Sequence, residues 1–183
     1  MLLLFVVVLG VLTEKSRADY FEWSSEVGGN GHYYEVIKVV ESINWVDAKD
    51  ISENKTYLGL QGHLVAITSE AENHFVANTM NGIIDAGWAG GYQPLGSPEP
   101  DGNWQWITGE SWEYSSWKTL EPNNNGDENA LQIHSSDNAI WLEKWNDLSM
   151  YNIQNGYIVE YEVPEPATLL LITLGGLILR KRK

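Results

Sequence analysis

The chain has 183 residues, of which 25 are acidic and 11 basic, and carries a formal net charge of −14 at pH 7. This length allows one domain of ordinary size. The acidic balance repels phosphate backbones and therefore speaks against nucleic acid as a partner. Because there is no cysteine, the sequence excludes disulfides, thiolate zinc sites and cysteine nucleophiles.

The first residues have the pattern of an export signal. Leu2 to Leu12 is an apolar run, too short for the roughly 20 residues that a spanning helix needs. Ser16 and Ala18 are small residues placed for a cut before Asp19. We expect residues 1–18 to be a signal peptide; the alternative is a buried N-terminal strand.

Two strands are expected in the first third of the domain. Residues 19–30 are polar and end in glycines, which indicates a linker. Residues 32–40 are rich in Tyr, Val and Ile and predict a strand. After Gly62, residues 63–67 predict a second strand.

Two helices are indicated by their N-terminal signals. Asn44 can cap a helix that presents Ala48 and Ile51 on one face. Ser69 and Glu72 have the spacing of a capping box, in which each side chain bonds to the backbone of the other. The second helix is therefore expected to run through residues 75–76.

The rest of the chain is rich in tryptophan, with seven of the nine tryptophans lying between Trp88 and Trp145. Short strands are expected at residues 87–90, 104–107, 130–133, 139–144 and 157–161. Strand, helix, strand, helix and then short strands around a long loop region predict an α+β fold with antiparallel pairing.

One segment has the composition of a cation site. Glu121-Pro122-Asn123-Asn124-Asn125-Gly126-Asp127-Glu128 combines carboxylates and amides with a proline and a turn-forming glycine. Calcium takes six to eight such oxygens. The Glu-Pro bond is a candidate for the cis isomer, and Asn146 and Asp147 offer two more oxygen-bearing side chains. From the spacing alone, a polar turn is the competing interpretation.

These residues resemble the sugar-binding calcium site of C-type lectins. The resemblance is carried by Glu121-Pro122-Asn123, by Glu128, and by Trp145-Asn146-Asp147. It extends to Trp45, Ala48 and the Gly62-His63-Leu64 stretch, to Trp88-Ala89-Gly90 and to the strand at 157–161. It implies a C-type-lectin-like fold over residues 31–163, with two helices, antiparallel sheets and a long calcium-binding loop region.

The resemblance also implies roles for single residues. The implied ligands of calcium, and through it of carbohydrate, are Glu121, Asn123, Glu128, Asn146 and Asp147. In that family two vicinal hydroxyls of the sugar coordinate the calcium, and Glu-Pro-Asn goes with mannose, glucose, N-acetylglucosamine or fucose, whereas Gln-Pro-Asp goes with galactose. The family's four common cysteines would fall near Ser52, Ala130, Met150 and Val159, so apolar packing must replace those cross-links.

The C-terminal residues 164–183 resemble the PEP-CTERM sorting signal of bacteria. Pro164-Glu165-Pro166 precedes an apolar segment, 167–179, and a basic end, 180–183. A plain membrane anchor is the alternative. The resemblance implies recognition by an exosortase, at least transient contact of 167–179 with a membrane, and delivery to the outer surface or extracellular matrix of a Gram-negative-type bacterium.

We therefore expect an exported calcium-dependent carbohydrate-binding module at the cell surface or in exopolysaccharide. The alternative is a lectin-like protein-interaction or adhesion module in which calcium is only structural. We expect no enzyme activity: Glu121 and Glu128 could be drawn as a glycosidase pair, but as calcium ligands they would be occupied. The four histidines are scattered along the chain.

Overall fold

The computed structural model describes residues 19–164. The strands are β1 (Tyr20–Glu22), β2 (Tyr33–Asn44), β3 (Thr56–Tyr57), β4 (Leu60–Leu64), β5 (Ala86–Tyr92), β6 (Gln105–Trp106), β7 (Ala130–His134), β8 (Trp145–Leu148) and β9 (Ile153–Tyr161). The helices are η1 (Ser25–Val27), α1 (Trp45–Glu53) and α2 (Glu70–Thr79). The expected signal peptide and most of the expected sorting segment lie outside the described residues.

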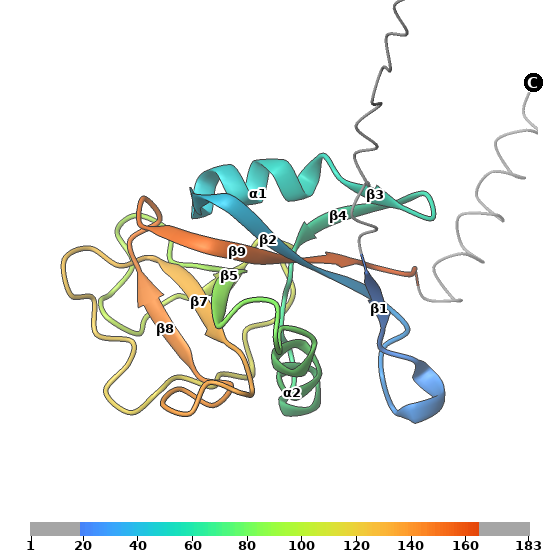
Figure 1. Cartoon of the computed structure of the whole chain (residues 1–183). Coiled ribbons are helices and arrows are strands. Elements are labelled where there is room, and N and C mark those ends of the chain that lie inside the picture. Colours follow the sequence, from blue (N-terminus) through green and yellow to red (C-terminus); the bar gives the residue numbers. More distant parts are fainter. Residues whose placement is uncertain (1–18, 165–183) are drawn as a thin grey trace, which may run out of the picture.

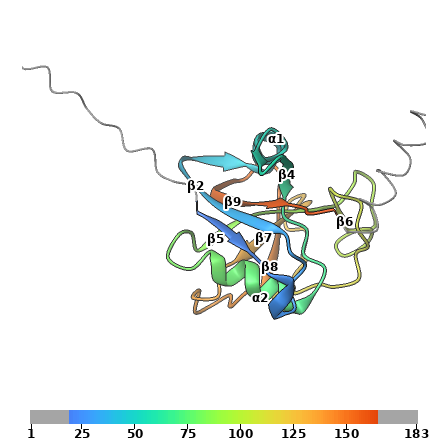
Figure 2. The ribbon, with the colours of Figure 1, turned by 90° about the vertical axis from the view of Figure 1, so that its right-hand side faces the viewer.

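The strands form one sheet around the long antiparallel pair β2 and β9. Its order is β1-β2-β9-β5-β7-β8, with β4 also pairing with β9. Figures 1 and 2 show α1 and α2 on opposite sides of β2 and β9. The pairing is antiparallel except between β5 and β9, where Trp88 lies opposite Tyr157 in a parallel bridge. The α+β prediction is confirmed.

Helix α1 begins where its cap predicts. The Asn44 side chain accepts a hydrogen bond of 2.9 Å from the backbone N–H of Asp47, which satisfies one of the free amides of the first turn. The buried face consists of Trp45, Ala48 and Ser52. Ile51, which was expected on the same face as Ala48, is 47% exposed and does not belong to this buried face. At 3.6 residues per turn it lies roughly a quarter turn from the buried stripe.

Helix α2 has only half of the expected capping box. Ser69 accepts from the backbone N–H of Glu72 at 3.2 Å. The Glu72 carboxylate does not return to Ser69; it accepts from the backbone N–H of Thr68 at 2.8 Å and from the hydroxyl of Tyr34 at 2.8 Å. Glu72 therefore connects the start of α2 to β2 inside the domain.

Two stretches differ from the sequence-based expectation. Within the expected linker 19–30, Tyr20–Glu22 is a strand paired with β2, and the Tyr20 ring stacks on Tyr57 with centroids 3.6 Å apart. The expected strand 139–144 is a series of turns. Its backbone bends because the Asn138 side chain accepts from the amides of residues 140 and 141, each at 3.1 Å. The strand begins at Trp145 instead.

The positions where the resemblance implies cysteines are filled by close packing. Ala130, Met150 and Val159 belong to one apolar cluster around Trp45 and Trp88. Near Ser52 the backbone comes so close that a Cβ on Gly62 would lie 2.8 Å from both the Ser52 carbonyl oxygen and a Val159 methyl. A larger residue at position 62 would therefore separate α1 from β9.

Candidate calcium and carbohydrate site

The loop region between β6 and β7 rests on a cluster of tryptophans. The rings of Trp106 and Trp112 lie 4.4 Å apart, and those of Trp104 and Trp117 lie 4.8 Å apart. Trp145 at the start of β8 contacts both Trp112 and Trp117 edge-on. This packing places the loop at the end of the sheet far from β1, at the left of Figure 1.

Asp147 connects strand β8 to the Glu121-Pro122-Asn123 segment. Its side chain is fully buried. One carboxylate oxygen accepts from the backbone N–H of Asn124 at 2.8 Å, and both oxygens accept from the N–H of Asn123 at 3.0 and 3.1 Å. The Glu121–Pro122 peptide bond is cis, as the sequence analysis proposed. The loop is thereby held against the sheet by a buried negative charge.

The other loop residues converge on the same place. The Asn123 side-chain amide donates to the Glu121 carboxylate. The backbone N–H of Asn125 donates to both the Asn123 side-chain oxygen and a Glu128 carboxylate oxygen, each at 2.9 Å. Four of the five predicted ligands, namely Glu121, Asn123, Glu128 and Asp147, therefore belong to one hydrogen-bonded group.

The electrostatics of this group disfavour a further negative charge. Burial raises the pKa of Glu121, and the neighbouring charges of Asp147 and Glu128 raise it further. Burial likewise raises the pKa of Glu128, with the charge of Asp147 as an additional cause. Among residues 19–164, no Lys, Arg or His forms an ion pair with these carboxylates.

Asn146 is the predicted ligand that stands apart. Its side-chain amide donates to Gln132 on β7 at 3.4 Å, and none of its hydrogen bonds in the described part of the chain reaches the loop. Gln132 in turn donates to Gln154 on β9 at 2.7 Å. Gln132 could not be singled out from the sequence, because only the β7–β8 register places it opposite Asn146.

Asn124 is a second residue that the sequence analysis did not assign a role. Its side-chain oxygen accepts from the backbone N–H of Glu128 at 2.7 Å, and its own N–H donates to Asp147. This tendency of asparagine to bond to a nearby backbone is a general property of turns and could have indicated its role. Asn124 thus connects the backbone at Glu128 to the carboxylate of Asp147.

The donor set fits a hard cation. Oxygens of carboxylates and amides are the ligands of calcium, and the group brings three carboxylates together, of which Glu121 and Glu128 have raised pKa values. Within residues 19–164, no three His, Cys, Asp or Glu side chains are arranged to hold a metal by themselves.

The chain matches the sequence model of one known family over more than half of its length. The sequence model of the Lectin C-type domain matches residues 41–158, which include both helices and every residue of the site. The chain belongs to the C-type lectin domain family. This family consists of binding proteins without catalytic activity.

Several proteins are similar in sequence to this chain. Halomucin of Haloquadratum walsbyi is 31% identical over 83% of this chain, which spans only 2% of that protein. Lithostathine-1 of Mus musculus is 30% identical over 58% of this chain and 60% of its own length. A protein described as C-type lectin lectoxin-Lio1, from Erythrolamprus poecilogyrus, is 36% identical, with 56% of each chain covered.

Solved structures agree on the fold. A mutant of CEL-I described as EPNH superimposes with a TM-score of 0.59 and 25% identity over 72% of this chain and 89% of that chain. Herring type II antifreeze protein has the same TM-score at 21% identity, over 74% of this chain and 94% of that chain. The C-type-lectin-like fold is therefore confirmed. Because one of these neighbours is described as an antifreeze protein, the fold alone does not determine the ligand.

The end of the chain matches a second sequence model. The PEP-CTERM protein-sorting motif covers residues 162–183, which confirms the resemblance noted for Pro164-Glu165-Pro166. The motif indicates export and association with the bacterial cell envelope. Residues 167–179, for which membrane contact was expected, lie outside the described residues; within 19–164 no helix has the length and apolar character to cross a bilayer.

Two aromatic residues near the candidate site, Trp117 and Trp141, already pack against other residues of the domain. Trp117 packs in the tryptophan cluster. Trp141 stacks on His134 with centroids 4.4 Å apart, and the Lys118 ammonium lies 3.6 Å from the centre of its ring. Burial and the nearby Lys118 charge lower the pKa of His134 to about 4. These contacts give both tryptophans structural roles.

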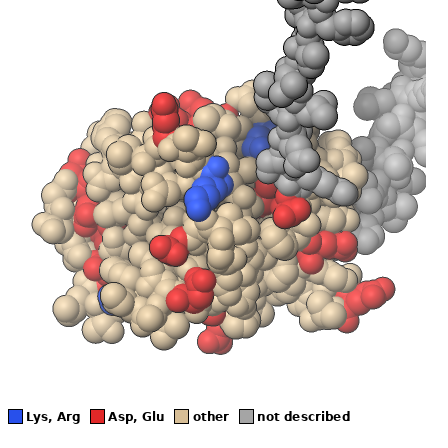
Figure 3. All heavy atoms as spheres, viewed as in Figure 1, with Lys and Arg blue, Asp and Glu red and all other residues tan. Residues whose placement is uncertain are grey.

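The acidic side chains of the surface are spread out and do not form one patch. Acidic side chains are spread over the face shown in Figure 3 and greatly outnumber the basic ones. Such a distribution suits solubility more than a single anionic binding patch. The carboxylates of the site are therefore distinguished by their mutual contacts and not by the charge of the surface as a whole.

Proposed function

We propose that this C-type lectin domain binds carbohydrate through a calcium ion held by Glu121, Asn123, Glu128, Asn146 and Asp147. One observation carries the proposal: four of these side chains belong to one hydrogen-bonded group, in which the buried Asp147 accepts from the backbone of the loop. Calcium, when bound, supplies a coordination site for two adjacent sugar hydroxyls. The family relationship supports the same assignment.

The residues of the chain itself set the direction of the sugar's hydrogen bonds. Glu121 is an anionic acceptor, and the neighbouring Asn123 has an amide that donates; the two side chains already contact each other. A pair of vicinal hydroxyls can donate to the carboxylate and accept from the amide. We propose that this arrangement favours mannose, glucose, N-acetylglucosamine or fucose over galactose.

A glycan array tests the proposal. The full chain, in a detergent that has no sugar headgroup, should bind mannose-type glycans with calcium and lose them with a chelator. Glu128→Gln should lose the same signals, whereas Asp50→Asn, an exposed carboxylate on α1, should keep them. Binding that is the same with calcium and with chelator would refute the calcium-dependent mechanism.

Protein contact is the second candidate, because large apolar side chains are exposed directly before Glu121 and in the β7–β8 connection. Leu120, directly before Glu121, is 87% exposed, and Ile140 in the β7–β8 connection is 75% exposed. In this alternative calcium would only order the loop. Leu120→Ser and Ile140→Ser would then abolish adhesion to a protein partner while leaving every glycan signal unchanged.

We further propose that an exosortase recognises the C-terminal signal and delivers the domain to the outer surface or exopolysaccharide matrix of a Gram-negative-type bacterium. The support is the PEP-CTERM match at 162–183. Removing residues 164–183 should release the domain into the medium or periplasm, as cell fractionation would detect. If the shortened chain stays with the envelope fraction, something other than this segment retains it.

A further inference from the structure

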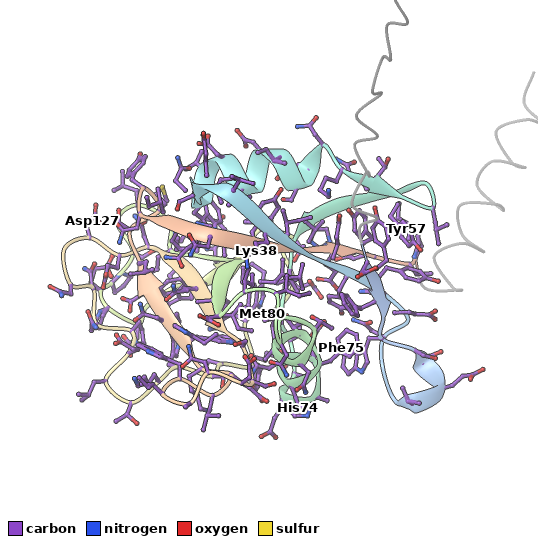
Figure 4. The ribbon with its side chains drawn as sticks, in the orientation of Figure 1. Lys38, Tyr57, His74, Phe75, Met80 and Asp127 are labelled. Carbon is purple, nitrogen blue, oxygen red and sulfur yellow. The ribbon has the colours of Figure 1, made fainter. Side chains whose placement is uncertain are left out.

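A pocket lies between β2, the start of β5 and β9, and none of the proposed calcium ligands lines it. It is a pocket of ≈ 210 Å³ whose polar lining is Lys38, Asp85, Gln154 and Asn155, with Ile83 and Ile84 as the main apolar lining. Pockets for drug-sized ligands are roughly 300–1,000 Å³, so this one suits a single small ring. Figure 4 places Lys38 in the middle of the face, over β2 and β9, and Asp127 at the far end of the calcium loop.

The polar groups of this pocket retain unused hydrogen-bonding capacity. Gln154 accepts from Gln132 through its side-chain oxygen, and Asn155 accepts from Ser42 through its own, at 3.2 Å. The amide nitrogens of Gln154 and Asn155 donate no hydrogen bond within residues 19–164. In the same part of the chain, neither Lys38 nor Asp85 forms an ion pair. The pocket thus offers three donor groups and one anionic acceptor.

The pocket is connected to the proposed calcium site by two amide side chains. Asn146 donates to Gln132, and Gln132 donates to Gln154, which lines the pocket. Gln154 of the pocket is therefore two side-chain hydrogen bonds away from Asn146, one of the five proposed calcium ligands. One oligosaccharide long enough to extend from Asn146 to Gln154 would contact both.

We propose that this pocket is a second, calcium-independent subsite that takes a neutral hexopyranose ring of the same glycan. The ring's hydroxyls would donate to Asp85 and accept from Lys38 and the two amides, while a C–H face rests on Ile84. An acidic sugar fits less well, because Asp85 lies in the pocket and the whole chain carries a net charge of −14. The identity of the glycan rests on the proposed function; the pocket and its chemistry do not.

Amide NMR spectra of the labelled full chain, in a detergent without a sugar headgroup, test the subsite directly. With chelator present, mannose and galactose should each shift the side-chain amide signals of Gln154 and Asn155, and glucuronate should shift them less. Asp85→Asn and Lys38→Gln should each weaken this binding about tenfold or more, since each removes a charged hydrogen-bonding partner. Asp50→Asn and Lys49→Gln on α1 serve as matched controls and should leave it unchanged.

The outcomes separate the subsite from the proposed function. Glu128→Gln should abolish calcium-dependent shifts at Asn146 and keep the shifts at Gln154 in chelator. If the wild type shows the shifts at Gln154 in chelator but no calcium-dependent shifts at Asn146, the calcium proposal is contradicted and the subsite is not. The subsite is overturned if Gln154 and Asn155 do not respond to neutral sugar, if glucuronate is preferred, or if Asp85→Asn binds as well as the wild type.

Discussion

Two groups of carboxylates in this domain are built in different ways. Glu72 on α2 and Glu160 on β9 are each 2% exposed, and the hydroxyl of Tyr34 donates to both, at 2.8 and 3.2 Å. The backbone N–H of Thr68 donates to Glu72, and that of Ala66 donates to Glu160 at 3.0 Å. Protein donors thus occupy the oxygens of this buried pair.

The second group, called the loop group here, consists of Glu121, Glu128 and Asp147 at the end of the sheet. Protein donors occupy fewer of its carboxylate oxygens. Asp147 resembles the buried pair, because backbone amides donate to both its oxygens. In the described part of the chain, Glu121 accepts only from the Asn123 side chain, and Glu128 only from the N–H of Asn125. Unused carboxylate oxygens next to a fixed negative charge are what a hard cation requires. The buried pair holds the fold together, whereas the loop group is suited to binding.

Removing the one fully bonded member of the loop group should have the largest effect. Asp147→Ala leaves the amides of Asn123 and Asn124 without an acceptor, and we expect a loss of about 3 kcal/mol in the free energy of unfolding. Denaturant unfolding without calcium measures it. Within residues 19–164 the Asn146 side chain bonds only to Gln132, so Asn146→Ala should change stability by less than about 0.5 kcal/mol. Equal losses in both variants would contradict the role given to Asp147.

The buried pair predicts a pH dependence of stability. Burial and the charge of Glu160 raise the pKa of Glu72 from 4.5 to about 7, against hydrogen bonds from Thr68 and Tyr34 that favour the carboxylate. The folded state therefore binds more protons than the unfolded state between about pH 4.5 and 7. Calcium-free stability should fall by up to about 3 kcal/mol as the pH rises through this window.

The control for this pH dependence is a change within the pair itself. Glu72→Gln removes the titrating group and should flatten the fall in stability between those pH values, in thermal melts at several pH values. Asp50→Asn, on the exposed side of α1, should leave the fall unchanged and so accounts for the general effect of net charge. An equally steep fall in Glu72→Gln would show that the pair does not cause it.

Calcium bound at the loop group should raise the stability of the whole folded domain. A ligand that binds only the folded state adds about 2.7 kcal/mol at a hundredfold excess over its dissociation constant. Glu128→Ala should abolish most of the resulting rise in the thermal midpoint. Acid should weaken the effect, because the raised pKa values of Glu121 and Glu128 mean that these ligands protonate early as the pH falls. A rise that survives Glu128→Ala would place the calcium elsewhere.

The smallest expected effect concerns sugar preference. The double change Glu121→Gln with Asn123→Asp keeps the oxygens and the net charge, but exchanges the donating and accepting sides. Preference should move from mannose-like toward galactose-like sugars by about 1–2 kcal/mol. Competition of free mannose and galactose against an immobilised glycan measures this. Equal inhibition by both sugars in both proteins, with calcium still bound, would favour the protein-contact alternative.

The parts of the fold that local chemistry determines were predictable from the sequence. Asn44 and Ser69 cap their helices as their side chains require, and the Glu-Pro-Asn segment and Asp147 meet as the family resemblance implied. The capping-box partner Glu72 was not predictable, because Tyr34 competes for its carboxylate from a distant strand. Residue 51 shows the same limit: its burial depends on what packs against the helix.

The hydrogen-bonded side chains of Gln132 and Gln154 could not be predicted from the sequence for a related reason. Gln132 and Gln154 are unremarkable residues of two strands, and their contact with each other depends on how β7 and β9 lie in the sheet. No local pattern encodes that neighbourhood. Likewise, the Asn138 turn converts an apolar stretch at 139–144 into a loop, although its composition favours a strand.

Calorimetric titration of calcium into the full chain tests the central claim most directly. The account predicts a calcium-specific heat that magnesium does not reproduce, that is lost in Glu128→Gln, and that is retained in Glu72→Gln, because the binding group is Glu121, Glu128 and Asp147 with their neighbouring amides. No calcium-specific heat at millimolar metal, or a heat that persists in Glu128→Gln and disappears in Glu72→Gln, would contradict it.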